Sequence, residues 1–99
     1  MTTINPEEVK QRLAAGETLN LLDVREPDEH LEFNIGGILI PLGKIQSMQI
    51  EEIEELRNEE IICYCRSGTR SMMAAMVLEQ LGFTNTKNLM GGMIAWQQK

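Results

Sequence analysis

Two cysteines and two arginines lie close together in residues 61–71, IICYCRSGTRS. Cys63 lies inside an apolar run, where burial keeps a thiol protonated and unreactive. Cys65 ends that run, Arg66 follows at once, and Arg70 comes four residues after Arg66. Nearby positive charge and the N-terminus of a following helix favour the thiolate, which is the nucleophilic form of cysteine. The sequence therefore predicts that Cys65 is the nucleophile and that Cys63 is structural.

The residues that follow Cys65 suit the binding of an anion. Ser67 and Thr69 offer hydroxyl donors, and Gly68 permits backbone angles that other residues rarely adopt. A tight loop of this kind turns successive backbone N–H groups inward, and the next helix adds its positive N-terminal end. Residues 66–70 are therefore predicted to cradle an anionic substrate. One arginine would attract the anion and the other would brace the loop, and the sequence does not assign the two roles.

Other uses of the two cysteines fit the sequence less well. In a strand, their Cα atoms would lie ~6.6 Å apart, near the upper limit for a disulfide bridge. One C-x-C pair with a single distant histidine, His30, does not supply four zinc ligands. We therefore expect reduced thiols, no metal and no cofactor.

Strand-like and helical segments alternate along the chain. Apolar runs predict strands over residues 19–24, 38–42, 60–65 and 86–90. Helices are expected from Pro6 to Gly16 behind an Asn5 cap, from Pro27, over residues 50–56, from the loop to Gly82, and after Gly91-Gly92. This order is typical of an α/β protein with a mainly parallel central sheet flanked by helices on both faces. The chain length fits one domain, residues 1–99. Such sheets bind ligands beyond the carboxyl ends of their strands, where the loop after Cys65 begins.

The charge and hydropathy of the chain limit its partners. The formal net charge is −6, which argues against nucleic acid and against an anionic membrane as the main partner. The apolar runs are too short to span a membrane, and the N-terminal stretch lacks the apolar core of a signal peptide. A cytoplasmic location is the expectation.

Three segments of the chain resemble the single-domain rhodanese sulfurtransferases. They are Asp23-Val24-Arg25-Glu26-Pro27, then Cys65-Arg66-Ser67-Gly68-Thr69-Arg70-Ser71, and Asn88-Leu89-Met90-Gly91-Gly92 through Trp96. The resemblance implies a rhodanese-like single domain and a sulfurtransferase that carries sulfane sulfur as a Cys65 persulfide. It also implies that Arg66, Ser67, Gly68, Thr69 and Arg70 bind the substrate.

The resemblance implies a small anionic donor, such as thiosulfate or a low-molecular-weight persulfide. The acceptor would be a thiol or a protein. Residues 34–38, NIGGI, look like the corresponding stretch of rhodanese domains attached to enzymes that activate sulfur-carrier proteins. A sulfur-carrier pathway protein is therefore one expected partner.

Two alternatives stay open beside sulfur transfer. One is a phosphatase or an arsenate reductase. Cysteine-dependent phosphatases look like C-x5-R, whereas Arg70 follows Cys65 as C-x4-R and Ser71 stands where that arginine would be. The shorter loop favours a sulfur atom over a tetrahedral phosphate. A non-catalytic interaction or sulfur-sensing module of the same fold has no need of the nucleophile.

Several other conspicuous residues are predicted to be structural. The resemblance suggests that Asp23 and Arg25 form a salt bridge or loop brace. His30 lies among acidic residues and is expected to be solvated, and Trp96 is expected to pack the last helix on the sheet. Four methionines are expected either to fill gaps in the core or to form an exposed patch beside the loop: Met72, Met73, Met76 and Met90.

Overall fold

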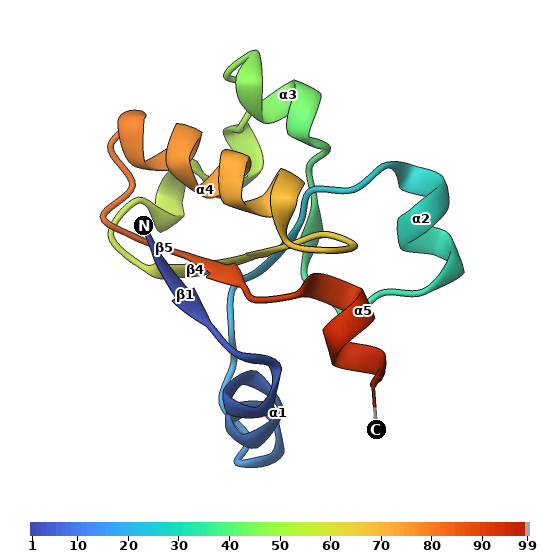
Figure 1. Cartoon of the computed structure of the whole chain (residues 1–99). Coiled ribbons are helices and arrows are strands. Elements are labelled where there is room, and N and C mark those ends of the chain that lie inside the picture. The colour runs from blue at the N-terminus through green and yellow to red at the C-terminus, as the bar shows by residue number, and fades with distance from the viewer. Residues whose placement is uncertain (99) are drawn as a thin grey trace.

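The fold is centred on a five-stranded sheet, seen in a computed structural model that describes residues 1–98 (Figure 1). The strand order is β1-β5-β4-β2-β3, and every neighbouring pair runs parallel. The predicted α/β class with a mainly parallel sheet is therefore confirmed. The strands are β1 (Thr2–Ile4), β2 (Leu21–Asp23), β3 (Ile38–Leu39), β4 (Glu60–Tyr64) and β5 (Asn85–Leu89).

Helices cover both faces of this sheet (Figure 1). One face carries α3, α4 and a short 3-10 helix, η1, whereas α1 and α5 cover the other. Helix α2 lies beyond the carboxyl ends of the strands, on the side where the loop before α4 turns. The bounds are α1 (Pro6–Ala14), α2 (Pro27–Glu32), α3 (Leu42–Gln46), η1 (Glu51–Leu56), α4 (Thr69–Gln80) and α5 (Gly92–Gln97).

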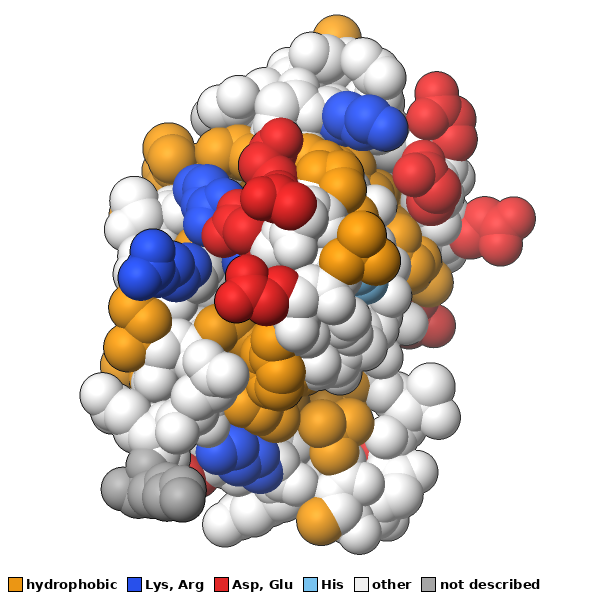
Figure 2. Space-filling model, turned by 90° about the vertical axis from the view of Figure 1, so that its right-hand side faces the viewer, with side chains coloured by type: hydrophobic (Ala, Val, Ile, Leu, Met, Phe, Trp, Pro, Cys, Tyr) orange, Lys and Arg blue, Asp and Glu red, His pale blue; other side chains and the backbone are white. Residues whose placement is uncertain are grey.

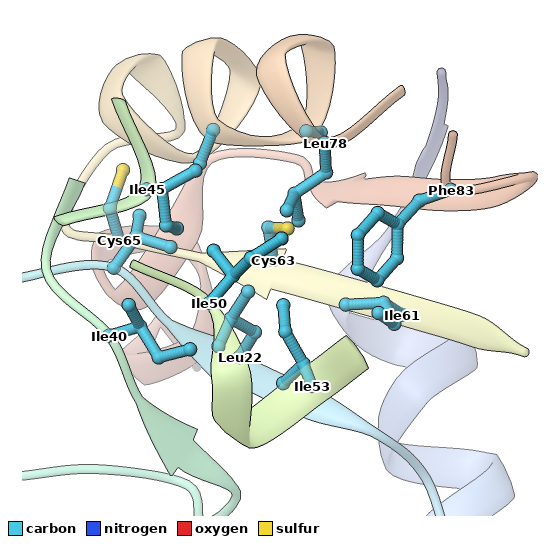
Figure 3. Packing of buried hydrophobic residues seen from close by; sticks show 13 residues of the cluster. Leu22, Ile40, Ile45, Ile50, Ile53, Ile61, Cys63, Cys65, Leu78 and Phe83 are labelled. Carbon is cyan, nitrogen blue, oxygen red and sulfur yellow. The ribbon is translucent and has the colours of Figure 1, made fainter. Parts of the chain in front are cut away.

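The core has two apolar clusters, one on each face of the sheet. Cys63 lies in β4, and Cys65 directly follows this strand. Their side chains point to the same face of the sheet because residues two apart in an extended chain share a side. Figure 3 shows the sulfur of Cys63 in the middle of the larger cluster, near Ile50 and Leu78. Cys65 lies at the end of that cluster, next to the first turn of α4. On one face of the sheet, a structural thiol therefore lies within the core, and a second thiol lies where the core meets the loop.

The predicted helix boundaries follow local capping chemistry. The Asn5 side chain accepts the backbone N–H of Glu8 at 2.8 Å, and Pro6 occupies the first turn of α1. After α4, Gly82 adopts φ +99°, which ends the helix as expected. These caps depend on residues close in sequence, so the sequence alone located them.

The structure differs from the predictions at one strand boundary, in the type of one helix and in two unpredicted elements, α3 and β1. The strand expected over residues 38–42 ends at Leu39, and Leu42 instead begins α3 because the fixed angle of Pro41 suits a helix start. The helix expected over residues 50–56 is a 3-10 helix rather than an α-helix. Strand β1 was not predicted, because its three residues show no strand-like pattern. Within residues 1–98, no helix is long and apolar enough to cross a membrane.

Candidate active site

The Cys65 sulfur lies inside a ring of hydrogen-bond donors at the end of β4. The whole residue is only 1% exposed. Its Sγ accepts the backbone N–H of Gly68 at 3.2 Å and that of Ser71 at 3.3 Å, and the Ser71 Oγ also lies at 3.3 Å. All of these donors come from the loop and the first turn of α4. The arrangement is suited to hold a negative charge on sulfur.

These contacts make the two thiols chemically different. Burial by itself raises the pKa of the Cys65 thiol, but the bonds from Ser71 and the loop N–H groups outweigh burial and place the pKa below its ordinary value. For Cys63, burial and the neighbouring Cys65 raise the pKa to about 12. Of the two cysteines, Cys65 is therefore the one whose thiolate form is favoured.

A second buried side chain, Asn88, also contacts the Ser71 hydroxyl and the loop. The Oδ1 of Asn88 accepts the Ser71 hydroxyl at 2.5 Å, and its Nδ2 donates to the Gly68 carbonyl at 3.1 Å. The Ser71 hydroxyl has one proton and two acceptors, so it donates to Sγ when Cys65 is a thiolate and is free to donate to Asn88 when Cys65 is a thiol. Asn88 thus connects β5 to the middle of the loop and to the residue that follows it.

The site predicted from the sequence ended at Arg70 and did not include Ser71 or Asn88. Ser71 appeared there as the end of a family segment and as the residue that a phosphatase would replace by arginine. Asn88 appeared only as part of a family segment, because nothing local signals that β5 lies beside the loop.

The loop is also fixed from outside by the start of α5. The N–H of Met93 donates to the Cys65 carbonyl at 2.9 Å, and the N–H of Ile94 donates to the Arg66 carbonyl at 3.0 Å. The carbonyls of the loop therefore point outward, which leaves its N–H groups facing the sulfur. Gly68 completes the turn with φ +101°, an angle that favours glycine.

The two arginines of the loop occupy different environments. The guanidinium of Arg70 makes two hydrogen bonds to the Glu29 carboxylate, at 2.7 and 2.9 Å, and holds the pKa of Glu29 at about 2. Arg66 is exposed, and within residues 1–98 its guanidinium forms no ion pair. The structure thus ties Arg70 to α2 and leaves the charge of Arg66 available to a ligand.

The hydroxyls of Ser67 and Thr69 do not reach the sulfur. Both residues are exposed, and their hydroxyls have no hydrogen-bond partner within the described chain. The hydroxyl that contacts Sγ belongs to Ser71. Ser67 contributes its backbone N–H instead.

A buried charge cluster lies next to the site, at the end of β2. Asp23 is 0% exposed and accepts two bonds from the Arg25 guanidinium, at 2.9 and 2.8 Å. The salt bridge expected between these two residues is therefore present. His30 was expected to be solvated, and this is wrong: its Nδ1 lies 2.8 Å from Asp23 Oδ2, and its side chain is 20% exposed. The sequence around His30 is polar, but α2 folds back over β2.

A cavity of about 420 Å³ opens beside the loop. Its walls carry four charged side chains, Arg25, Glu29, Glu32 and Arg66. On the side of the molecule that carries α2, acidic and basic side chains lie next to one another with hydrophobic side chains between them (Figure 2). The apolar part of the wall consists of Phe33, Met93 and Ile94.

The four methionines singled out from the sequence are exposed rather than buried in the core. Their exposed fractions lie between 40% and 53%. Three of them lie on α4, and Met90 precedes the glycines that begin α5. Of the two expectations for these residues, gap filling is wrong and exposure is confirmed: Met72, Met73, Met76 and Met90. Trp96 packs against the smaller core cluster, as expected.

No group of three or more potential metal ligands occurs among residues 1–98. The candidate chemistry centres on one cysteine and the hydrogen-bond donors around it.

Comparison with known proteins identifies the family. The profile of the rhodanese-like domain matches residues 5–99. A sulfurtransferase of Allochromatium vinosum is 38% identical over 94 residues, which cover 94% of this chain and 85% of that protein. A human thiosulfate:glutathione sulfurtransferase is 29% identical over 109 residues and is covered to 94%, with 98% of this chain aligned. A rhodanese-like domain protein of Staphylococcus aureus has a closely similar structure, with a TM-score of 0.85 at 28% identity, covering 100% of this chain and 94% of that one.

The chain belongs to the rhodanese-like domain family. With relatives named sulfurtransferases, it is a rhodanese-type sulfurtransferase. It also resembles a putative sulfur carrier protein, YrkF of Bacillus subtilis, at 40% identity over 97 residues. That match covers 97% of this chain and 51% of YrkF, so this chain spans about half the length of that relative.

Replacing Ser71 by alanine is expected to raise the pKa of Cys65, because the variant loses the hydroxyl that donates to the thiolate. The thiolate can be followed by its ultraviolet absorbance as the pH is raised. Ser67→Ala is the matched control, since its exposed hydroxyl does not contact the sulfur and its backbone N–H remains. Equal titration curves for the two variants would contradict the role given to the Ser71 hydroxyl.

Proposed function

We propose that this protein transfers sulfane sulfur through a persulfide on Cys65. The observation that carries the proposal is the ring of donors around Sγ, from the N–H groups of Gly68 and Ser71 and the Ser71 hydroxyl. A ring of this size favours an anionic sulfur on the cysteine. These donors stabilise both the attacking thiolate and the persulfide that replaces it.

In the first step the Cys65 thiolate attacks the outer sulfur of a donor such as thiosulfate. A bond forms between Sγ and that sulfur, the sulfur–sulfur bond of thiosulfate breaks, and sulfite leaves with the bonding electron pair. The unpaired guanidinium of Arg66 would attract the anionic donor, while Arg70 braces the loop against Glu29. Ser67, Gly68 and Thr69 complete the wall of the substrate site.

In the second step a thiol or a protein takes the outer sulfur and releases the Cys65 thiolate. The names of two relatives support this choice of partners. One is a thiosulfate:glutathione sulfurtransferase, whose name pairs an anionic sulfur donor with a low-molecular-weight thiol. The other is a putative sulfur carrier protein, which supports a protein partner in sulfur-carrier chemistry.

Phosphate chemistry fits these residues less well than sulfur chemistry does. A phosphatase loop needs an arginine free to bind the phosphate, whereas Arg70 is held by Glu29 and position 71 is a buried serine in contact with Sγ. A non-catalytic binding module does not need a nucleophile, so it would not explain why the pKa of Cys65 is lowered.

Incubation with thiosulfate should add about 32 Da to the intact protein, the mass of one sulfur atom, and cyanide should remove it. Cys65→Ser should not gain this mass. Cys63→Ser is the matched control and should load as the wild type does, because Cys63 is protonated and buried in the core. A wild type that never gains sulfur, or a Cys65→Ser variant that does, would sink the proposal.

A further inference from the structure

The cavity beside the loop contains two charges that the fold itself does not neutralise. Of its four charged side chains, Arg25 is paired with Asp23, and Glu29 is paired with Arg70. The remaining two, Arg66 and Glu32, are both exposed, and neither forms an ion pair with any other described residue. One free cation and one free anion therefore face the same space.

This pair of charges selects among ligands. The walls carry two guanidinium and two carboxylate groups, so their formal charges cancel. A small dianion such as thiosulfate gains from Arg66 but is repelled by Glu32. A ligand with a carboxylate and an ammonium group satisfies both, because a guanidinium binds a carboxylate through paired hydrogen bonds and a carboxylate binds an ammonium group.

The size and the apolar wall of the cavity also favour an organic ligand over a small inorganic anion. Its volume of about 420 Å³ lies within the roughly 300–1,000 Å³ of small-molecule sites. Phe33, Met93 and Ile94 supply apolar surface, which suits the carbon chain of a peptide rather than a bare inorganic anion. Arg66 lines the cavity, and the N–H of Met93 donates to the Cys65 carbonyl, so the cavity adjoins the loop that follows the nucleophile.

The geometry points to a zwitterionic, peptide-sized thiol as the sulfur acceptor, with Glu32 as the residue that selects it by binding its ammonium group. This assignment rests on the persulfide proposed above, since the cavity serves the second step. The acceptor thiolate attacks the outer sulfur of the Cys65 persulfide. The bond from Sγ to that sulfur breaks, the electron pair returns to Sγ, and the acceptor leaves as its persulfide anion.

Two acceptors that differ only in the ammonium group test the assignment. Glutathione carries the group, and glutaryl-cysteinyl-glycine has the same length and thiol but lacks it. Because the amino group is far from the thiol, its removal leaves the reactivity of the sulfur unchanged. The protein is loaded with thiosulfate, and the rate of sulfur transfer to each peptide is measured over a range of peptide concentrations, with cyanide as a third acceptor.

Wild-type protein should prefer glutathione by about two- to fivefold in kcat/KM, the range expected for one ion pair at an exposed site. Glu32→Gln should abolish that preference. The matched control is Asp28→Asn, an exposed carboxylate of the same helix outside the cavity, and it should keep the preference.

A wild type that treats both peptides alike, or a Glu32→Gln variant that keeps the preference, would overturn the assignment. These results are separable from failure of the persulfide itself. A protein that takes up no sulfur from thiosulfate would remove the proposed function. A protein that loads, and discharges to cyanide, but ignores the ammonium group would remove only the role of Glu32.

Discussion

Asp23→Ala is expected to lower the free energy of unfolding by about 3–5 kcal/mol, the usual cost of removing one partner of a buried ion pair. Asp23 is completely buried, and Arg25 is only 5% exposed. The Arg25 guanidinium would keep its bond to the Phe33 carbonyl at 2.6 Å but would lose its counter-charge. His30 would lose its partner as well. Urea unfolding followed by circular dichroism measures the effect.

Two further variants separate the effect of the buried ion pair from the effect of removing any carboxylate. Replacing both residues, as Asp23→Ala with Arg25→Met, should destabilise less than Asp23→Ala alone, because no unpaired buried charge remains. Asp28→Ala removes an exposed carboxylate and should change stability by no more than about 0.5 kcal/mol. If Asp23→Ala and Asp28→Ala proved equally stable, the buried pair would have no structural role.

The pH dependence of this loss has a definite sign. Burial alone raises the pKa of Asp23, but bonds from Arg25 and His30 outweigh burial and hold the pKa below its ordinary value. The carboxylate therefore stabilises the fold above its unfolded pKa of about 3.9, and this contribution is lost as the pH falls below that value. The difference between wild type and Asp23→Ala should accordingly be full at neutral pH and shrink in acid.

Gly92→Ala is expected to reduce the rate of sulfur loading by about 100-fold, because displacements of about 1 Å at a reacting group have effects of that order. A Cβ at position 92 would lie 2.4 Å from the Cys65 carbonyl oxygen and 2.6 Å from that of Arg66. Both atoms belong to the backbone of the loop, so the loop itself would have to move. The glycine also has φ +55°, which adds strain for alanine. Intact mass after timed exposure to thiosulfate gives the rate.

The matched control for this substitution is Gly43→Ala in α3. No atom lies within 4 Å of a Cβ at that position, and its backbone angle is not in the left-handed region. Loading should be unchanged, and stability should stay the same or rise by about 0.4–1 kcal/mol. Should Gly92→Ala load as fast as Gly43→Ala, the contact between α5 and the loop would have no part in positioning Cys65.

The sequence was sufficient wherever the relevant interactions are local. The different environments of Cys63 and Cys65 follow from their places in one strand, and the helix ends follow from Asn5 and Gly82. The parallel sheet follows from the alternation of elements, since parallel neighbours need crossover connections. The family segments place the nucleophile because they include the whole loop.

The sequence was insufficient wherever residues distant in the chain meet. His30 lies in a polar stretch, and only the packing of α2 on β2 brings it to Asp23. Asn88 reaches the loop because β5 lies beside β4, a pairing that no local pattern reveals. The separate environments of Arg66 and Arg70 likewise depend on Glu29, which is distant from both in the chain.

The hold of α5 on the loop has a consequence for the order in which the protein is made. Residues 92–97 are synthesised after the cysteine they help to position, and β1 at the start of the chain pairs with β5 near its end. A nascent chain that has emerged only as far as α4 has Cys65 but lacks Asn88 and the N–H groups that fix the loop. The groups that lower the pKa of Cys65 belong to residues 67–71, but the contacts from α5 that hold their loop in place can form only after α5 has been made.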